Sequence, residues 1–553
     1  MSKNRVWVRI VVLLAAVGFL FSVLVFRLAV VQLWNGPRLA EGAFRQRAVQ
    51  VPLELPRGVI YDRNWRPLSD GYWRRVVVVF PGQVDRDLVV AETLGPLVNQ
   101  GSDELLRRFQ KARGEPWLLV PPSGEELDQA VSEGGLPGVL VTLQRVRYGP
   151  RALAGHTVGY VRPSDGTGVS GLEKAFDSVL RGRYPASILA LVDGKGNLIP
   201  GLGFRRREPG QARNHLRTTL DVTVQETVES VLGKQGVRKG AVVVVDVPTG
   251  DILAVASRPG YRQDRPDLYL NSPGEPFLNR AVQAFTPGSV FKVVVAAAAL
   301  EEGVVDLYDT FFCPGYVDVS GYRFGCYEKD GHGLLTFGEA LARSCNAVFV
   351  EVGLRLGRER IMKYARAFGL GQSTGLPLGQ EVSGHLPPPW ETGPVATGNL
   401  ALGQGSLTAT PVQMAALVAA VANDGLKPTL RLVQEVRADG GEVKEVFPQR
   451  SPVRVISRTT ARKLKTALGW TLSRGTAASL DIPAYLAAGK TGTAETGRTD
   501  SSGKKVTHAW FAGFAPLSRP RYAVVVFVEE GGAGPVAAAP IFGAIVEELL
   551  GWE

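Results

Sequence analysis

The sequence predicts a multidomain protein of the α+β class with one N-terminal transmembrane helix. Three observations support this prediction. An apolar run covers residues 10–33, helical and strand patterns alternate between residues 34 and 215, and strand patterns at both ends of residues 216–553 enclose a mostly helical middle. Such an order predicts a sheet with a cluster of helices packed beside it. At 553 residues, the chain is long enough for two or more domains with sizeable cores.

The composition is that of a folded protein with a basic surface. Apolar residues make up 45% and charged residues 21% of the chain, which excludes wholesale disorder. The formal net charge of +11 indicates contact with anionic surfaces. No RNA-binding, zinc-finger or basic-zipper pattern accompanies this charge, so no nucleic-acid partner is expected. Anionic lipid or an anionic cell-wall polymer fits better, and a merely basic, soluble surface is the alternative.

Residues 10–33 are predicted to form a single-pass membrane anchor. The run from residue 10 to residue 26 is uncharged and strongly apolar, and it resumes after Arg27, whose side chain can snorkel to the membrane surface. Basic residues within residues 1–9 place this tail in the cytoplasm and the rest of the chain outside the cell, by the positive-inside rule. A cleaved signal peptide is the alternative, but the apolar core is long and no small-x-small cleavage site follows it.

Residues 34–215 contain no combination of nucleophile and base, so they are predicted to be a non-catalytic spacer or interaction domain. The expected elements are a strand, a helix and a second strand, at residues 76–80, 105–111 and 117–120.

A new domain is predicted to begin at residue 216. Asp221 is placed to cap its first helix. The other elements expected there are two apolar strands joined by a hairpin turn, a later strand and a terminal helix. They cover residues 241–247, 252–257, 522–529 and 541–550.

Residues 286–292 contain the candidate nucleophile. A Pro-Gly turn leads into a helix that is apolar nearly all round and therefore buried. Ser289 lies at its first turn, and Lys292 follows three residues later on the same face. Burial lowers the pKa of a lysine, so a neutral Lys292 can accept the Ser289 proton. The same Ser-x-x-Lys spacing recurs at Ser501 and Ser502, but there it lies in a polar loop with no buried helix behind it.

Two further motifs follow in order and strengthen this assignment. Ser-Cys-Asn at residues 344–346 comes after a helical pattern, and Lys-Thr-Gly-Thr at residues 490–493 precedes an apolar stretch. With Ser-x-x-Lys they form the signature of penicillin-binding proteins and related β-lactamases. The alternative for Ser344 and Thr491 is an ordinary helix cap or strand turn.

The three cysteines are expected outside the membrane, where disulfides are permitted. Cys313–Cys326 would close a short local loop. Cys326–Cys345 would tie that loop to the second motif and make activity redox-sensitive. Free thiols are the third possibility. The five histidines are scattered, and no His-Glu-x-x-His or Cys-x-x-Cys spacing is present, so neither a metal site nor a cofactor is expected.

With these motifs, the chain resembles the class B penicillin-binding proteins, the monofunctional peptidoglycan D,D-transpeptidases. Further family motifs lie at Arg57, Gly58, Ile60, Asp62, Arg63 and Asn64, at Gly168, Gly171, Leu172 and Glu173, and at Gly403, Gln404, Gly405, Thr410, Pro411 and Gln413. The resemblance implies an elongated α/β pedestal or dimerisation domain over residues 34–215. It also implies a transpeptidase domain over residues 216–553, with a five-stranded antiparallel sheet flanked by helices and a helical subdomain.

The resemblance also implies a reaction and roles for individual residues. Ser289 attacks the penultimate D-Ala of a peptidoglycan stem peptide, terminal D-Ala leaves, and an amine of a neighbouring stem then resolves the acyl-enzyme. Lys292 takes the serine proton, and Ser344 and Asn346 relay protons and hold the substrate. Lys490 is also implied as catalytic, and with Thr491 it anchors the substrate or β-lactam carboxylate. Gly492 and Thr493 are implied in substrate binding as well. Backbone N–H groups of Ser289 and Thr493 form the oxyanion hole.

The implied partners are stem peptides, β-lactam antibiotics and a membrane glycosyltransferase of the shape, elongation, division and sporulation type. The glycosyltransferase would contact the anchor and Arg57, Gly58, Asp62 and Arg63. A DD-carboxypeptidase or β-lactamase-like hydrolase, a β-lactam sensor and a catalytically silent scaffold are the alternatives. The long pedestal argues against the hydrolase, the short tail before the anchor argues against the sensor, and the intact motifs argue against the scaffold.

Overall fold

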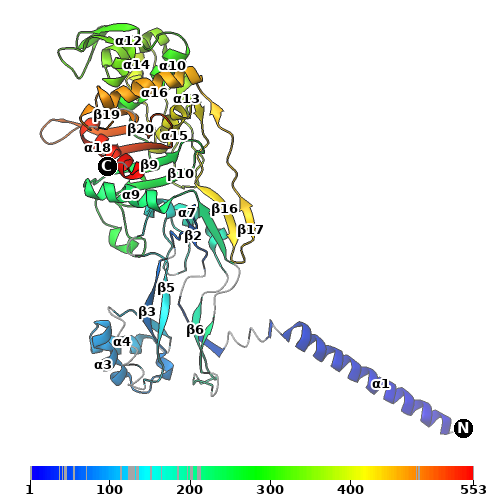
Figure 1. The fold of residues 1–553 in the computed structure, drawn as a ribbon. Coiled ribbons are helices and arrows are strands. Elements are labelled where there is room, and N and C mark those ends of the chain that lie inside the picture. The colour runs from blue at the N-terminus through cyan, green and yellow to red at the C-terminus, as the bar shows by residue number, and fades with distance from the viewer. Residues whose placement is uncertain are drawn as a thin grey trace. The chain divides into compact units, whose positions relative to one another are not determined.

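The computed structural model describes residues 3–36, 38–39, 42, 47–53, 57–69, 71–112, 115–121, 131, 136–149, 152–163, 165–182, 186–195, 197–199, 203–207, 213–480, 482–483 and 486–551 (Figure 1). The chain divides into two compact units. The first unit comprises Met1–Leu55, Trp73–Arg145 and Tyr184–Gly210, and the second comprises Pro56–Tyr72, Val146–Arg183 and Gln211–Glu553. These units follow spatial contacts rather than chain order, and the predicted domain boundary at residues 215 and 216 remains a prediction.

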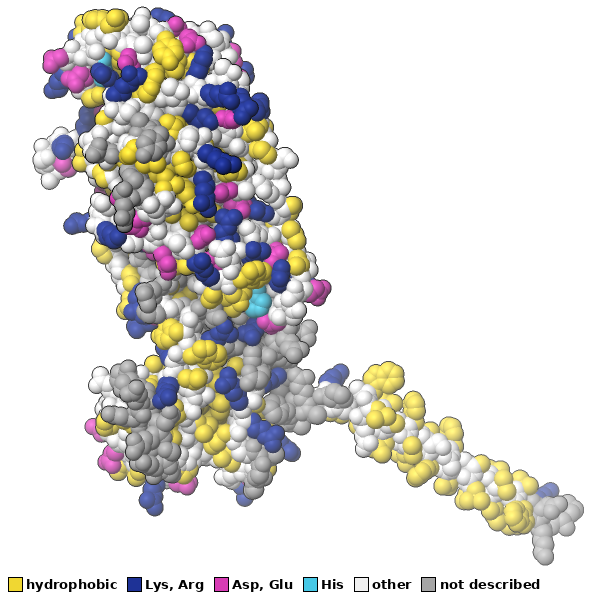
Figure 2. Space-filling model, viewed as in Figure 1, with side chains coloured by type: hydrophobic (Ala, Val, Ile, Leu, Met, Phe, Trp, Pro, Cys, Tyr) yellow, Lys and Arg dark blue, Asp and Glu magenta, His cyan; other side chains and the backbone are white. Residues whose placement is uncertain are grey.

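The N-terminal helix has the length and composition of a membrane span. It consists of α1 (Lys3–Ala29) and the π-helical turn η1 (Val30–Trp34). The stretch Arg5–Trp34 is the one helix among the described residues that is long and apolar enough to cross a bilayer. Its hydrophobic side chains are exposed along its length (Figure 2). This helix contains the predicted anchor at residues 10–33 and fits a single-pass membrane protein.

The first unit contains two small sheets, and residues 76–79 of one strand, β3, are buried on both faces. One sheet has the order β4-β3-β5 and the other has the order β1-β6-β7. The elements are β1 (Ala48–Pro52), β3 (Tyr72–Val79), η2 (Pro81–Gln83), α3 (Asp87–Val98), α4 (Ser102–Ala112), β4 (Trp117–Leu119), β5 (Val139–Val146), β6 (Ser187–Leu191) and β7 (Phe204–Arg207). Val77 and Val79 pack in a core with α3 and α4, whereas Val76 and Val78 pack in a second core with β1 and β6. Burial on both faces explains the unbroken valine run, and the strands and helix predicted here are confirmed.

In the second unit, the motif that contains Arg57 and Asp62 pairs with a strand from later in the chain. Its sheet has the order β17-β16-β8-β2, and β2 is parallel to β8. The elements are β2 (Ile60–Tyr61), α6 (Gly155–Val158), α7 (Gly171–Ala175), α8 (Asp177–Leu180), β8 (Asn214–Thr218), β16 (Val433–Ala438) and β17 (Val443–Val446). Asp62 is fully buried and accepts the backbone N–H groups of Asn64 at 2.7 Å and Arg66 at 2.8 Å.

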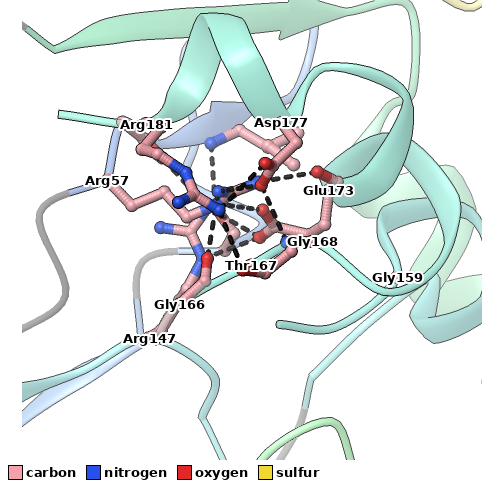
Figure 3. A network of polar contacts seen from close by, with 12 residues as sticks. Arg57, Arg147, Gly159, Gly166, Thr167, Gly168, Glu173, Asp177 and Arg181 are labelled. Atoms are coloured by element: carbon pink, nitrogen blue, oxygen red, sulfur yellow. Dashed lines mark hydrogen bonds and ion pairs between the residues drawn. The ribbon is translucent and has the colours of Figure 1, made fainter. Parts of the chain in front are cut away.

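Arg57 lies at the centre of a buried polar network (Figure 3). Its guanidinium donates to Glu173 Oε2 at 2.6 Å and to Asp177 Oδ1 at 2.6 Å. Arg147 and Tyr148 donate to the other Glu173 oxygen at 2.7 and 2.9 Å. The Arg57 and Glu173 side chains are only 1% and 0% exposed, so each depends on the other to balance a charge removed from water. The network ties the chain before β2 to α7.

A five-stranded antiparallel sheet forms the centre of the second unit, with the order β10-β9-β21-β20-β19 (Figure 1). Its strands are β9 (Gly240–Asp246), β10 (Ile252–Arg258), β19 (Ala488–Thr499), β20 (Lys505–Ala515) and β21 (Tyr522–Val528). Helices α9 (Val222–Lys234) and α18 (Ala539–Leu550) share one core with one face, and α15 (Pro411–Ala422) packs on the other. Asp221 caps α9 by accepting the Thr223 N–H at 3.0 Å. The predicted cap, hairpin, strand, terminal helix and sheet are confirmed.

The predicted helical middle is a helical subdomain that also contains short strands. Its principal helices are α10 (Lys292–Glu301), α11 (Phe337–Ala342), α12 (Asn346–Leu356), α13 (Arg358–Ala367), α14 (Pro394–Ala401) and α16 (Arg458–Ser473). Two strand pairs interrupt it: β11 (Thr310–Cys313) with β14 (Gly333–Thr336), and β12 (Tyr316–Val319) with β13 (Tyr322–Gly325). The expectation of a mostly helical middle did not include these pairs, although the aromatic and β-branched residues of β11, β12 and β13 favour strands. The remaining elements are η3 (Pro266–Tyr269), η4 (Arg280–Val282), η5 (Gly288–Phe291), β15 (Leu426–Lys427), β18 (Val453–Arg454), η6 (Ala478–Leu480) and α17 (Gly534–Ala537).

Candidate active site

Ser289 lies in the 3₁₀ turn η5, which leads directly into α10. The α-helix begins only at Lys292, so the serine precedes it rather than lying within it. Gly288 has a left-handed backbone (φ +55°), and a Cβ there would lie 2.6 Å from the Thr493 carbonyl oxygen. The Gly288 N–H donates to the Gly403 carbonyl at 3.0 Å. Close approach of these backbones therefore requires glycine and fixes the turn that presents Ser289.

Lys292 is fully buried and contacts the second motif. Its Nζ atom donates to Asn346 Oδ1 at 2.6 Å and to the Ser344 carbonyl at 2.8 Å, and it lies 3.3 Å from Ser344 Oγ. Burial lowers the pKa of Lys292 to about 8, although the nearby thiols of Cys345 and Cys326 act in the opposite direction. A substantial fraction of Lys292 is therefore neutral near physiological pH and can accept a proton.

A tight connection between α11 and α12 positions Ser344. This residue has a left-handed backbone (φ +55°), and its N–H donates to the Leu341 carbonyl at 3.1 Å. The turn directs both the carbonyl and the hydroxyl of Ser344 toward Lys292. Asn346 begins α12, and its Nδ2 atom donates to the Gly325 carbonyl of β13 at 2.9 Å. The second motif is thus held between Lys292 and the β12–β13 hairpin.

The third motif lies on β19, the edge strand of the central sheet beside η5. Lys490 is fully buried, and its Nζ atom donates to the Thr491 carbonyl at 3.0 Å. Burial, and next the charge of Lys292, hold the pKa of Lys490 well below its usual range. Because like charges repel, protonation of one lysine disfavours protonation of the other. A Cβ on Gly492 would lie 2.6 Å from Val290 Cγ2, so only glycine lets β19 pack this closely against η5.

The three motifs meet at a cleft of ≈ 1070 Å³. The predicted residues that line it are Ser289, Ser344, Asn346, Thr491 and Thr493. Lys292, Lys490 and Gly492 are buried behind this lining. All eight predicted catalytic and substrate-binding residues therefore gather around one site, and their individual roles remain predictions. Ser501 and Ser502 lie instead in the exposed turn between β19 and β20.

Several residues of the cleft were missed by sequence reasoning. Thr476 lines the wall, and its Oγ1 atom lies 2.5 Å from Thr491 Oγ1. The sequence feature that could have pointed to Thr476 is the glycine before it. Gly475 packs so closely against the Ala342 carbonyl oxygen that a Cβ would not fit, and this contact places Thr476 at the cleft. Residues 322–327 form another part of the wall. Their contribution depends on how the β12–β13 hairpin folds back, which local sequence does not reveal.

Four potential metal ligands gather beside the second motif: Cys313, Cys326, His332 and Cys345. One ligand atom from each lies within 4.8 Å of all the others. All three cysteines are free thiols, so of the predicted alternatives neither disulfide is present. The expectation of no metal site rested on motif spacing, and the structure corrects that argument because the four donors come from separate segments of the chain.

The four residues predicted to contact a glycosyltransferase are mostly enclosed. Arg57 and Asp62 are 3% and 0% exposed, and Gly58 is buried as well. Arg63 keeps 30% of its side chain exposed. Partner contact through this segment remains a prediction, and Arg63 is its most accessible member.

Comparison with known proteins matches the chain to two family models. Residues 240–547 match the penicillin binding protein transpeptidase domain, and residues 52–212 match the penicillin-binding protein dimerisation domain. Stage V sporulation protein D of Bacillus subtilis is 32% identical over 96% of this chain and 84% of the relative. Peptidoglycan D,D-transpeptidase MrdA of Escherichia coli is 30% identical over 90% of this chain and 86% of the relative.

Solved structures show the same likeness. Penicillin binding protein 3 from Mycobacterium tuberculosis superposes with a TM-score of 0.63 and 25% identity, covering 91% of this chain and 96% of that one. The D,D-transpeptidase domain of a peptidoglycan glycosyltransferase from Eggerthella lenta gives a TM-score of 0.61 and 28% identity, covering 74% of this chain and 93% of that one.

Proposed function

The chain belongs to the penicillin-binding protein transpeptidase family, and on that premise we propose that it is a peptidoglycan D,D-transpeptidase with Ser289 as the acylated nucleophile. One observation carries the residue assignment. Lys292, with a pKa of about 8, is buried next to the Ser289 turn and bonded to both Ser344 and Asn346. This is the arrangement that an activated serine requires: a base of suitable pKa, oriented by fixed partners.

Acylation uses the first two motifs. As Ser289 Oγ bonds to the carbonyl carbon of the penultimate D-Ala, its proton passes to neutral Lys292. The carbon–nitrogen bond to terminal D-Ala then breaks, and the departing amine receives a proton through the Ser344 hydroxyl, which lies 3.3 Å from Lys292 Nζ. Proton transfer by positioned groups of this kind contributes about 10²- to 10⁴-fold to a rate.

The third motif is assigned to binding and to stabilisation of the tetrahedral intermediate. Alternate N–H groups of the edge strand β19 point away from β20 and are available to a ligand. We assign the N–H groups of Thr493 and Ser289 to the oxyanion, an interaction worth about 3 kcal/mol for one donor. Thr491 and Lys490 bind the substrate carboxylate. The carboxylate of a β-lactam makes the same contacts.

Deacylation decides between cross-linking and hydrolysis. In a transpeptidase, the amine of a second stem peptide attacks the acyl-enzyme carbonyl, the ester to Ser289 breaks, and the serine regains its proton. In the alternative hydrolase, water takes the place of this amine. The likeness to a relative named peptidoglycan D,D-transpeptidase favours the amine acceptor.

Intact-mass spectrometry with benzylpenicillin tests the acylation step in wild type, Ser289→Ala and Lys292→Arg. We expect a long-lived adduct on wild type, none on Ser289→Ala, and slow formation on Lys292→Arg, because an arginine stays protonated. A stem-peptide donor with and without an acceptor amine then separates cross-linking from hydrolysis. Rapid turnover without an adduct would indicate a β-lactamase-like hydrolase, and no reaction in wild type would indicate a silent scaffold.

We also propose that α1 anchors the protein with its N-terminus in the cytoplasm and the catalytic unit outside, next to a glycosyltransferase of the shape, elongation, division and sporulation type. The support is the apolar helix and the basic residues at its N-terminal end, including Arg5 and Arg9. Labelling of a cysteine introduced at an exposed position, as in Ser502→Cys, from outside intact cells tests the orientation, with the unsubstituted chain as the background control. Co-purification of the glycosyltransferase tests the partner, and its retention after replacement of α1 and Arg63 would contradict this contact.

A further inference from the structure

The cluster of Cys313, Cys326, His332 and Cys345 has the donor set and the dimensions of a closed metal site. The Cys326 Sγ atom lies 3.5 Å from His332 Nδ1 and 4.0 Å from Cys345 Sγ, and all four ligand atoms lie within 4.8 Å of one another. In a tetrahedral zinc site, with Zn–S near 2.3 Å and Zn–N near 2.0 Å, ligand atoms are about 3.5–3.8 Å apart. The observed separations therefore need only a small contraction around an ion.

The backbone around the cluster is shaped to bring these donors together. Cys313 ends β11 opposite Gly333, at the start of β14. A Cβ on Gly331 would lie 2.2 Å from the Cys313 carbonyl oxygen, so the segment that carries His332 can approach Cys313 only with glycine at this position. The Cys326 N–H donates to the Gly315 carbonyl at 2.8 Å, which closes the base of the β12–β13 hairpin.

His332 has a hydrogen-bond partner at the ring nitrogen that faces away from the cluster, as metal-binding imidazoles usually do. Its Nδ1 atom faces Cys326, and its Nε2 atom lies 3.3 Å from the Tyr327 hydroxyl. A hydrogen bond at the far nitrogen fixes both the ring orientation and the tautomer of a ligating histidine. A disulfide explains this arrangement less well, because it would pair two sulfurs at about 2.05 Å and leave the other thiol and the imidazole without a role.

We propose that Cys313, Cys326, His332 and Cys345 bind one Zn²⁺ ion. Three thiolates and one imidazole form a ligand set typical of structural zinc and leave no position open for water or substrate. Binding forms three Zn–S bonds and one Zn–N bond and releases the protons of those cysteines that were still thiols to solvent, with no change of redox state.

The ion joins the hairpin wall of the cleft to the second motif. Cys345 lies between Ser344 and Asn346, the two residues that contact Lys292. Cys326 follows the hairpin residue Gly325, whose carbonyl accepts a bond from Asn346. Zinc therefore holds Ser344 and Asn346 against both Lys292 and the hairpin. This effect on acylation rests on the proposed function, whereas metal binding itself does not.

Metal content tests the binding directly. The full chain is purified in detergent under reducing conditions, equilibrated with Zn²⁺, dialysed against metal-free buffer and measured by elemental mass spectrometry. We expect one zinc per chain in wild type and in His385→Gln, which changes an exposed histidine away from the cluster. We expect Cys326→Ser and His332→Gln to lower zinc affinity more than about 100-fold, beyond the cost of outer-shell substitutions.

Two further measurements keep the proposal falsifiable if a variant folds poorly. Co²⁺ in place of zinc should give thiolate charge-transfer bands in wild type, and His332→Cys should restore binding as a four-thiolate site. Wild type without stoichiometric zinc would overturn the proposal. So would unchanged affinity in both ligand variants, or a wild-type mass two hydrogens lighter that shows a disulfide. Zinc binding with no benzylpenicillin adduct would support the metal site and contradict only the proposed function.

Discussion

The Nζ atom of Lys292 lies 2.6 Å from Oδ1 of Asn346, in a position that solvent does not reach. This contact joins the first motif to the second, and among the described residues the lysine has oxygen acceptors but no carboxylate as hydrogen-bond partners. Burial therefore dominates its protonation.

Acylation should depend on the protonation of Lys292. The pKa of this lysine is lowered to about 8, and only its neutral form accepts the Ser289 proton. The rate of acylation by a β-lactam should therefore rise with pH and level off above about pH 8. At pH 6, two units below that pKa, it should be about 100-fold lower. Stopped-flow measurement on protein that circular dichroism shows to be folded checks this, and a flat profile from pH 6 to 8 would contradict it.

Gly288→Ala should abolish fast acylation without unfolding the protein. The added Cβ would meet the Thr493 carbonyl oxygen at 2.6 Å and push the Ser289 turn away from β19. Gly303→Ala is the matched control, because Gly303 also has a positive φ (+67°) but open space around it. The second-order rate constant for a fluorescent penicillin is the measurement. Equal rates in the two variants would show that the close contact does not matter.

Glu173→Gln should destabilise the second unit by about 3–5 kcal/mol, because the buried Arg147 would lose its carboxylate partner and Arg57 would keep only Asp177. Arg57 and Arg147 both donate to this side chain (Figure 3). Thermal unfolding followed by circular dichroism provides the test. Lys444→Gln, which breaks an exposed ion pair with Glu442, is the control and should leave the melting temperature unchanged. An equally small shift for Glu173→Gln would refute the structural role of the network.

Thr476→Val should slow acylation modestly. The Thr476 hydroxyl lies 2.5 Å from the Thr491 hydroxyl and orients it in the cleft. Loss of one such bond costs about 0.5–1.5 kcal/mol, which corresponds to about a 2- to 10-fold change in rate. Thr476→Ser keeps the hydroxyl and should behave like wild type. If the serine variant is impaired as much as the valine variant, packing rather than the hydrogen bond is responsible.

Features that depend on residues close together in the sequence could be predicted. Asp221 caps its helix through a bond to a residue two positions away, and Ser289 and Lys292 lie three residues apart where η5 leads into α10. The order of the three motifs identified the rest of the catalytic set, although it did not indicate which members are buried.

Contacts between residues that lie far apart in the sequence could not be predicted. Thr476 meets Thr491 only because α16 ends beside β19. Likewise, Cys313 meets His332 only because β11 pairs with β14. The resemblance assigned Arg57 to a partner surface, but its burial follows from contacts with Glu173 and Asp177, which lie more than a hundred residues away.

The glycine contacts around Ser289 also limit how the protein can evolve drug resistance. A Cβ on Gly403 would lie 2.1 Å from the Gly288 carbonyl oxygen, and a Cβ on Gly492 would lie 2.6 Å from Val290. Substitutions at these positions would impair cell-wall synthesis together with antibiotic binding, so selection would remove them. Under β-lactam pressure, we expect surviving alleles to change the rim of the cleft instead, at positions such as Gln404 and Thr496, where side chains border open space.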